Sequence, residues 1–535
     1  MELNGIKTNH QEKMWVIKIA LALFLLTSLP FIIGALVQDD QWLFSGFYFG
    51  VEDGNSYVAK MLNGNYGDWL FKTPYSVYPQ TGFLAFLPYI LLGKLASPPG
   101  LHAQLLVLYQ FFRLLGAIVM CIGTYKFISF YFDDIRLRRI GTIMGVAGAG
   151  FGWLYIMGWE RLWGGRIPLE FYSPETFGFL SFMSLPHLSM ARGLLLMALS
   201  MFLKQMDGQT VMSKWLGGAI LLMVGFCQPL TVLVGWVVIG ISILVTLAVR
   251  VRKKQPVMLA VLIREYAWYY LIPSPLIIYT FLKFNYDPFL SGWASRNIIL
   301  SPPPTDYLLS YGLFLIVAIL AVIKIVKNKD RKYVAIISWL TLVPFLIYFP
   351  YNLQRRFAEG SWLVLIVLVC YYFREHPNGI TGLRITLGLS LISPLIFFAG
   401  GVIGTTNKAY PIYIENSMVA LLENVQQQIR ADDVVIADYA ISNALPAYFN
   451  VHTVVGHGPE SVNPGLDLDA NDELFSGISS PKIREYICRS GGEWVLARSV
   501  SLPNQAVLGE CCHLIAENEQ FHLYQVNQSY CVDDE

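Results

Sequence analysis

The chain has 535 residues, of which 55% are hydrophobic, 14% aromatic and only 14% charged. Soluble domains usually carry about a quarter charged residues, so this composition argues against a cytosolic enzyme; it also excludes a disordered chain, a collagen-like chain and a small disulfide scaffold. The net charge of +1 hides an uneven distribution: residues 1–404 hold 32 Lys and Arg against 19 Asp and Glu, whereas residues 405–535 hold 6 against 18. The sequence therefore predicts a basic membrane part followed by an acidic polar tail.

Apolar stretches long enough to cross a bilayer recur through the first 404 residues. A spanning helix needs roughly 20 apolar residues, because the bilayer core offers no water to unsatisfied backbone groups. We expect eleven spans, and residues 215–250 are expected to form a hairpin that turns at Gln228-Pro229. The expected spans are 14–37, 104–130, 140–158, 176–203, 215–227, 229–250, 266–285, 307–326, 333–350, 361–373 and 383–404.

Basic residues in the short loops predict the orientation of these spans. Clusters such as those at 136–139 and 250–254 all fall on one side if residues 82–96 do not cross the membrane. That stretch is short and interrupted by Pro88, which suits a re-entrant or surface-lying helix. We therefore expect an integral plasma-membrane protein with a cytoplasmic N-terminus, a first outer loop at 38–103 and an extracytoplasmic tail.

The tail at 405–535 carries short apolar runs that are typical of a small α/β domain. Strands are expected at 434–437, 452–455, 494–497 and 521–526, with helices at 440–448 and 481–490. The predicted fold class is thus an α-helical polytopic membrane domain over 1–404, with juxtamembrane helices in its first outer loop, plus a small C-terminal α/β domain over 405–535.

Two features of the tail leave alternatives open. Its cysteines, Cys488, Cys511, Cys512 and Cys531, would face an oxidising compartment, and a disulfide and free buried thiols are equally good interpretations. His457 lies in a glycine-flanked turn, where a lone histidine is more often structural than catalytic, although this loop could lean over an active site.

The first outer loop gathers acids close to a hydrophobic helix end. Asp39, Asp40, Glu52 and Asp53 all follow within about 15 residues of the first expected span. Ionised groups at a lipid boundary are costly unless they are solvated or paired, so they mark a functional cavity. A carboxylate there could act as a general base or bind a divalent cation such as Mg²⁺ or Mn²⁺. The alternative is a solvated loop in which Asp53 or Asn55 caps a helix at 56–63.

This loop resembles the first outer loop of the GT-C superfamily of glycosyltransferases, in particular the aminoarabinose transferase and protein mannosyltransferase group. The resemblance rests on Glu52-Asp53-x-x-x-Tyr57-x-x-x-Met61-x-x-Gly64, followed by Asp68-Trp69 and Tyr78-Pro79-Gln80. By its position before Tyr57, Asp53 matches the family's catalytic aspartate, and Glu52 is the neighbouring carboxylate. The resemblance implies inverting transfer of a sugar from a polyprenyl-phosphate donor to an extracytoplasmic acceptor, with Asp53 as the base.

Other outer residues are candidates for binding the substrates. Asp39, Asp40 and Tyr57 are joined by Glu160, Glu170 and Glu175 of the second outer loop, which could bind sugar hydroxyls or help Asp53 to hold a metal ion. His187, in the helix that follows, could be a ligand, but a lone histidine in a membrane helix can also simply hydrogen-bond a neighbour.

Arg355 and Arg356 form a basic pair on the predicted outer side, against the general trend of the loops. Guanidinium groups fork onto phosphate oxygens, so this pair predicts a site for the donor phosphate, and Arg296 is the next candidate. The alternative is that these arginines snorkel to lipid head groups.

Two other function classes compete with the enzyme. A lipid or solute transporter or flippase would place charged residues near the middle of the membrane, often within internal repeats. A non-catalytic assembly protein would use its tail to bind a partner. We expect contacts with membrane lipids and no nucleic-acid partner, and no Walker A loop is found that would couple ATP hydrolysis.

Overall fold

A computed structural model describes residues 10–209, 213–256, 259–503, 505–527 and 529–531. The chain divides into two compact units, each assembled from separate stretches of sequence. We call them the helical unit (Met1–Leu29, Phe111–Phe281 and Ile298–Gly400) and the tail unit (Pro30–Gln110, Leu282–Asn297 and Gly401–Glu535). The tail unit thus contains the first outer loop as well as the C-terminal residues. The expected division of the chain into a membrane domain over 1–404 and an extracytoplasmic domain over 405–535 stays a prediction.

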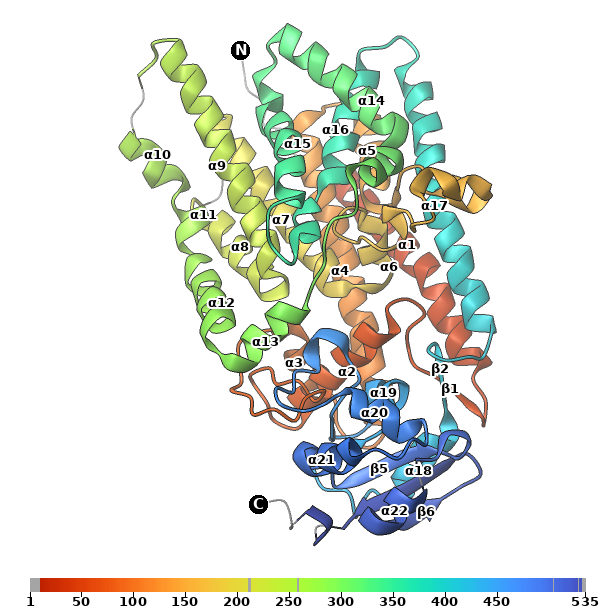
Figure 1. Cartoon of the computed structure of the whole chain (residues 1–535). Helices are drawn as coiled ribbons and strands as arrows, with labels where there is room; N and C mark the ends of the chain where they lie inside the picture. Colours follow the sequence, from red (N-terminus) through yellow and green to blue (C-terminus); the bar gives the residue numbers. More distant parts are fainter. Residues whose placement is uncertain (1–9, 210–212, 257–258, 504, 528, 532–535) are drawn as a thin grey trace. The chain divides into compact units, whose positions relative to one another are not determined.

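Long apolar helices dominate the chain, as expected for a membrane protein. Among the described residues, seven helices are long and apolar enough to cross a bilayer. Residues 354–360 form a short turn ahead of the sixth, α16 (Ser361–Arg374). The other six are α1 (His10–Val37), α4 (Leu101–Tyr131), α7 (Pro186–Met206), α9 (Pro229–Arg252), α14 (Pro304–Asn328) and α17 (Gly379–Thr406), labelled in Figure 1.

The remaining expected spans are shorter helices, for local reasons. The expected span at 140–158 ends early, at Ala147, and the chain continues through a glycine-rich stretch into the short turn η1 (Tyr155–Trp159). The span at 176–203 divides at Leu185, because Pro186 cannot donate a helical hydrogen bond and begins a new helix. The hairpin at Gln228 is present. These helices are α5 (Ile135–Ala147), α6 (Gly178–Ser184), α8 (Leu216–Cys227), α10 (Leu259–Tyr266), α11 (Trp268–Leu271), α12 (Ser274–Tyr286) and α15 (Val334–Ile347).

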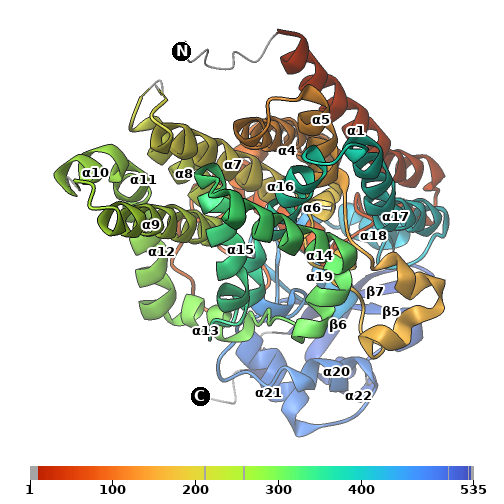
Figure 2. The same cartoon turned by 90° about the horizontal axis from the view of Figure 1, so that it is seen from above.

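Close helix packing in the helical unit depends on small residues. α16 is buried from Ser361 to Tyr371, which fits a helix that is apolar on every side over this stretch. α4 and α7 approach each other at glycines, and a Cβ added at Gly123 would lie 2.1 Å from the carbonyl oxygen of Gly193. Figure 2 shows these helices from above. Without side chains at this crossing the two backbones come into direct contact, as is common between membrane helices.

The tail unit contains two helices of the first outer loop, α2 (Val51–Asn65) and α3 (Leu87–Gly93). With seven residues, α3 is too short to cross a bilayer, as expected of 82–96. The loop is tied to the C-terminal residues by a two-stranded antiparallel sheet of β1 (Trp42–Phe44) and β2 (Tyr413–Glu415). The short helix α13 (Pro288–Arg296) belongs to the same unit.

A five-stranded mixed sheet forms the core of the C-terminal residues, in the order β4-β3-β5-β7-β6. Successive residues of β5 alternate between two apolar clusters: Trp494 and Leu496 face one cluster and Val495 the other. Because both faces are covered by helices, the strand is apolar from Trp494 to Ala497. The small α/β domain predicted from the sequence is confirmed. Its elements are α18 (Asn416–Asn424), β3 (Val434–Ile436), α19 (Tyr439–Tyr448), β4 (His452–Thr453), α20 (Asp469–Phe475), α21 (Pro481–Ser490), β5 (Trp494–Arg498), α22 (Gln505–Cys511), β6 (Cys512–Glu517) and β7 (Phe521–Val526).

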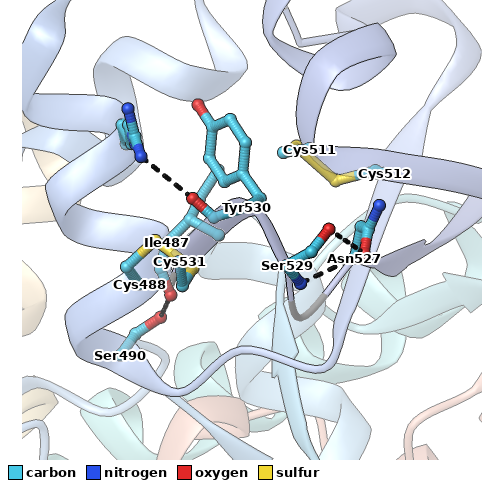
Figure 3. Close-up of a disulfide and its surroundings, with 10 residues drawn as sticks. Ile487, Cys488, Ser490, Cys511, Cys512, Asn527, Ser529, Tyr530 and Cys531 are labelled. Carbon is cyan, nitrogen blue, oxygen red and sulfur yellow. Dashed lines mark hydrogen bonds between the residues drawn. A yellow bond between two sulfur atoms is a disulfide. The ribbon is translucent and has the colours of Figure 1, made fainter. Parts of the chain in front are cut away.

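All four tail cysteines are bonded. Cys488, near the end of α21, pairs with Cys531, 43 residues later, and Cys511 pairs with its neighbour Cys512 (Figure 3). The backbone N–H of Asn527 donates to the carbonyl of Cys511 at 2.6 Å. The structure therefore selects the disulfide interpretation over free thiols, and disulfides are typical of an oxidising compartment.

Candidate functional site

Glu52 and Asp53 lie in the first turn of α2, where the helix dipole favours negative charge. The helix begins after Gly50, whose φ of 60° is left-handed and suits glycine, and no side chain caps it. The capping alternative for Asp53 and Asn55 is therefore wrong, because the helix starts earlier than 56. Glu52 Oε1 accepts hydrogen bonds from the Tyr439 hydroxyl at 2.5 Å and from the backbone N–H of Gly458 at 3.0 Å.

Asp53 faces a histidine from the C-terminal part of the same unit. His457 Nε2 lies 3.3 Å from Asp53 Oδ1. The side chain of His457 is 9% exposed and that of Asp53 is 56% exposed, so the carboxylate reaches solvent while the imidazole does not. Burial by itself lowers the pKa of His457, but the charge of Glu460 and the hydrogen bond with Asp53 outweigh it and raise this pKa above its ordinary value.

A buried ion pair lies behind this contact. Lys60 Nζ, on the same helix as Asp53, is 2.8 Å from Glu460 Oε1. Glu460 belongs to the 3-10 turn η6 (Gly458–Glu460) that follows His457, and its Oε2 accepts from the Thr73 hydroxyl at 2.6 Å. Burial would raise the pKa of Glu460, and Lys60 and His457 together lower it below the ordinary value.

Other candidate residues of the tail unit have structural partners. Arg296, at the end of α13, donates from Nη1 to the carbonyl of Ser461 at 2.5 Å. Tyr57 stacks on Tyr89 with ring centroids 4.6 Å apart. Asp39 accepts from the backbone N–H of Trp42 at 2.8 Å and pairs with Lys408, while the exposed Asp40 accepts from Asn416 through its carbonyl oxygen. Asp39 and Asp40 thus help to join β1 to β2.

The helical unit holds the remaining candidates, and two of its acids are buried. Glu170, in the 3-10 turn η3 (Leu169–Phe171), accepts from the backbone N–H of Gly152 through Oε1, while no hydrogen bond to a described residue is found for Oε2. Burial raises the pKa of Glu170 to about 7. Glu175 is also buried, and its Oε1 lies 3.9 Å from Arg356 Nε. Glu160 is exposed, and His187 is the second residue of α7.

The arginine pair lies in the turn η5 (Gln354–Ala358). The guanidinium of Arg355 stacks over the ring of Tyr172 with its Cζ 4.8 Å from the centroid. The Nε atoms of both Arg355 and Arg356 are buried, and neither has a hydrogen-bond partner among the residues that the structure describes. A buried donor without a partner is costly, so an anion with several acceptor oxygens fits this position.

Sequence reasoning overlooked a second ion pair in this region. Arg166 forks onto the buried Asp306, with Nε and Nη2 at 3.0 and 2.7 Å from the two carboxylate oxygens. Both charges act on Tyr172, the ring on which Arg355 stacks. The two partners are 140 residues apart, so no local pattern in the sequence could predict that they pair.

The residues that the structure describes form no binding site for the expected divalent cation. Across the described ranges, no group of three or more His, Cys, Asp or Glu side chains is placed to hold a metal ion. The described residues therefore do not fit a divalent metal ion. A cavity of about 110 Å³ in the helical unit is lined by Lys126, Met197, Ser200, Met201 and Lys204, none of which is a predicted site residue.

No family model matches the sequence, and a search of curated proteins finds no match either. Among solved structures, the chain is similar to the oligosaccharyltransferase of Archaeoglobus fulgidus tethered with an acceptor peptide containing the NVT sequon, with a TM-score of 0.50, 12% identity, and 90% of this chain and 69% of that chain covered. The chain has the GT-C fold. This fold is the one expected from the resemblance of the first outer loop, and at this identity the likeness establishes the fold alone.

Two further structures with the GT-C fold are those of ArnT from Cupriavidus metallidurans. In the apo state the TM-score is 0.47 with 11% identity, and 95% of this chain and 98% of that chain are covered. Bound to undecaprenyl phosphate, the TM-score is 0.42 at the same identity and coverage. The fold assignment rests on the oligosaccharyltransferase, whose TM-score is higher.

Proposed function

We propose that this chain is a membrane glycosyltransferase that moves a sugar from a polyprenyl-phosphate donor to an extracytoplasmic acceptor with inversion at the anomeric carbon. Asp53 accepts the proton of the acceptor, and the acceptor atom then bonds to the anomeric carbon. The bond from that carbon to the phosphate oxygen breaks, and polyprenyl phosphate leaves. The glycosyl phosphate donor carries its own leaving group, so the protein need only bind and orient the two substrates and deprotonate the acceptor.

The observation that carries this proposal is the combination of exposure and fixed orientation at the Asp53 carboxylate. It is half exposed at the start of a helix, yet a buried histidine holds one of its oxygens. A general base needs both properties, because it must reach the acceptor and must be fixed in direction. The GT-C fold and the resemblance of the loop around Asp53 to that superfamily support the same role.

The second support lies in the helical unit. Arg355 and Arg356 each bury a guanidinium nitrogen that has no hydrogen-bond partner in the described part of the chain, and a phosphate group offers the missing acceptors. We propose that these two arginines bind the donor phosphate and stabilise the charge that develops on it as the sugar departs.

The test compares Asp53→Asn with the wild type in transfer assays. The full-length protein is purified, reconstituted, and supplied with polyprenyl monophosphates that carry radiolabelled hexoses, with an extract of periplasmic or extracellular material as acceptor. We expect transfer by the wild type and a loss of roughly 10²- to 10⁴-fold in the variant, with unchanged thermal stability. Asp68→Asn, in the loop after the same helix, is the matched control and should keep its activity.

Two outcomes would contradict the proposal. Full transfer by the Asp53→Asn variant would remove Asp53 as the base. Movement of labelled polyprenyl phosphate between leaflets by the wild type, without any transfer of sugar, would favour the flippase class instead.

A further inference from the structure

The loop that carries His457 is fixed to its surroundings from three directions. Glu460 Oε1 pairs with Lys60 of α2 at 2.8 Å, and the carbonyl of Ser461 accepts from Arg296 at 2.5 Å. The backbone N–H of Gly458 donates to Glu52 Oε1 at 3.0 Å. These contacts bracket His457 on the C-terminal side within four residues, so the imidazole has little freedom to move.

The direction of the hydrogen bond between His457 and Asp53 follows from chemistry. An ionised carboxylate can only accept, so Nε2 must carry the proton that it shares with Asp53 Oδ1 over 3.3 Å. Nδ1 is buried, lacks a hydrogen-bond partner among the described residues, and lies 3.8 Å from Glu460 Oε1. A protonated Nδ1 therefore faces a carboxylate across a short gap.

The charges around the imidazole favour its cationic form. Glu460 and Asp53 stand on either side of it, and Lys60 opposes them. Tyr75, whose ring centroid is 5.6 Å from that of His457, is uncharged because burial holds its pKa well above the ordinary value. Two carboxylates against one ammonium leave the imidazolium charge compensated in a buried position.

We propose that His457 is the positioning residue of Asp53. It holds Oδ1 by donating from Nε2, places the imidazolium charge beside the carboxylate, and leaves the direction of Oδ2 fixed toward the acceptor. Glu460, anchored by Lys60, balances the charge of the imidazolium from behind. This inference rests on the proposed function, since it assigns His457 a role in the reaction of Asp53.

The arrangement also assigns a task to the C-terminal part of the tail unit. The residue that orients the base is 404 positions away from it in the sequence. A truncated chain that keeps the first outer loop but lacks the loop at 456–461 would retain the carboxylate and lose its orientation.

The test uses two substitutions of His457 that differ in one property. Gln can place an amide N–H near the former Nε2 without carrying charge, whereas Leu fills a similar volume and donates nothing. His522→Gln and His522→Leu are the matched controls, because His522 lies on β7 beside a carboxylate, with Nδ1 3.2 Å from Glu517 Oε2. Each full-length variant is assayed with a radiolabelled polyprenyl-phosphate hexose that the wild type accepts.

We expect kcat to fall roughly tenfold to hundredfold in His457→Leu, with KM for the donor unchanged, and to recover in part in His457→Gln. The wild type should also lose activity at alkaline pH as the imidazolium deprotonates, whereas the Gln variant should lack this alkaline limb. A merely structural histidine would change the folded fraction and leave kcat per folded molecule and the pH profile as they are, which would overturn the proposal.

A double-mutant cycle separates this inference from the proposed function. The thermal stabilities of Asp53→Asn, His457→Leu and the double variant need no substrate, and a direct contact makes the two effects non-additive. Additive effects would show that the two side chains do not interact, whatever the enzyme does. If the cycle shows coupling but the wild type transfers no sugar from any polyprenyl-phosphate donor, then the proposed function fails while the contact stands.

Discussion

Lys60 Nζ and Glu460 Oε1 lie 2.8 Å apart although 400 residues separate them, and their side chains are only 1% and 2% exposed. Lys60 also donates to the Ser56 hydroxyl and lies over the rings of Phe71 and Phe86. A buried pair of this kind adds little stability by itself, but each charge is strongly unfavourable without the other. The pair therefore makes the placement of the loop at 456–461 depend on α2.

Lys60→Met should destabilise the tail unit by about 3 to 5 kcal/mol, because it leaves the Glu460 carboxylate buried without its cation. The double variant Lys60→Met/Glu460→Gln removes both charges and should recover most of this loss. Thermal unfolding of the detergent-purified full chain measures both. A double variant that is as unstable as the sum of the two single variants would contradict the prediction.

The stability of the protein should depend on pH through His457. Its pKa is raised in the folded protein, so the stabilisation it provides is fully present below its ordinary pKa, near 6.5, and is lost as the pH rises through the folded value. The melting temperature of the wild type should therefore exceed that of His457→Gln by more at pH 5.5 than at pH 8.5.

Tyr75→Phe is the control for this pH dependence. Tyr75 donates to the carbonyl of Asn443 at 2.9 Å, and its raised pKa lies outside the tested range. Loss of the Tyr75 hydroxyl and its hydrogen bond should lower the melting temperature by a similar amount at both pH values. A gap for His457→Gln that grows toward alkaline pH would show that the sign of the pKa shift is wrong.

Replacing Arg355 by Gln should weaken binding of the donor. A hydrogen bond to a charged group contributes roughly 1.5 to 3 kcal/mol, which corresponds to about a tenfold to hundredfold rise in KM for the polyprenyl-phosphate sugar. Arg355→Lys should recover little, since an ammonium cannot reproduce the planar fork or the stacking on Tyr172. Arg136→Gln, in an exposed pair with Asp134, should leave KM unchanged. Equal KM values for Arg355→Gln and the wild type would remove Arg355 from the phosphate site.

The crossing of α4 and α7 should not tolerate a methyl group. A Cβ at Gly193 would lie 2.5 Å from the backbone of Val119, so Gly193→Ala forces the helices apart and should cost about 1 to 3 kcal/mol. Gly388→Ala, in α17 with open space around the new Cβ, should be neutral or slightly stabilising. Melting temperatures of the two variants decide the matter, and equal values would argue against this close approach.

Several features of the fold could be predicted from local sequence because their causes are local. The length and apolar character of α1, α4 and α17 are those of membrane-spanning helices, which satisfy their own backbone hydrogen bonds in the bilayer. The short interrupted stretch around α3 could not cross a bilayer, and the apolar runs of β3, β5 and β7 indicated buried strands. The carboxylates Glu52 and Asp53 stood out for the same reason, because charge beside a hydrophobic helix end has an energetic cost that calls for an explanation.

Several helix boundaries differ from those expected, because single proline and glycine residues decide where a helix begins. Pro186 begins a new helix inside a stretch that is apolar enough to be continuous, and Gly50 allows α2 to start five residues earlier than expected. β6 was not expected at all, since three of its six residues, His513, Ala516 and Glu517, are polar or small, and its pairing with β7 supplies the hydrogen bonds that hold it as a strand.

The partners of the candidate base were settled by tertiary structure alone. In the sequence, His457 is a histidine in a glycine-flanked turn, and nothing within ten residues distinguishes it from a structural one. Its meaning depends on Asp53 and Lys60, about 400 residues earlier, and periodicity or composition cannot record which loop meets which helix. The amino-acid sequence determined that the chain is a membrane protein with carboxylates close to the end of a hydrophobic helix, because burial and hydration act on each segment separately. Folding decided which charges surround Asp53, because electrostatic interactions depend on distance in space and not on distance along the chain.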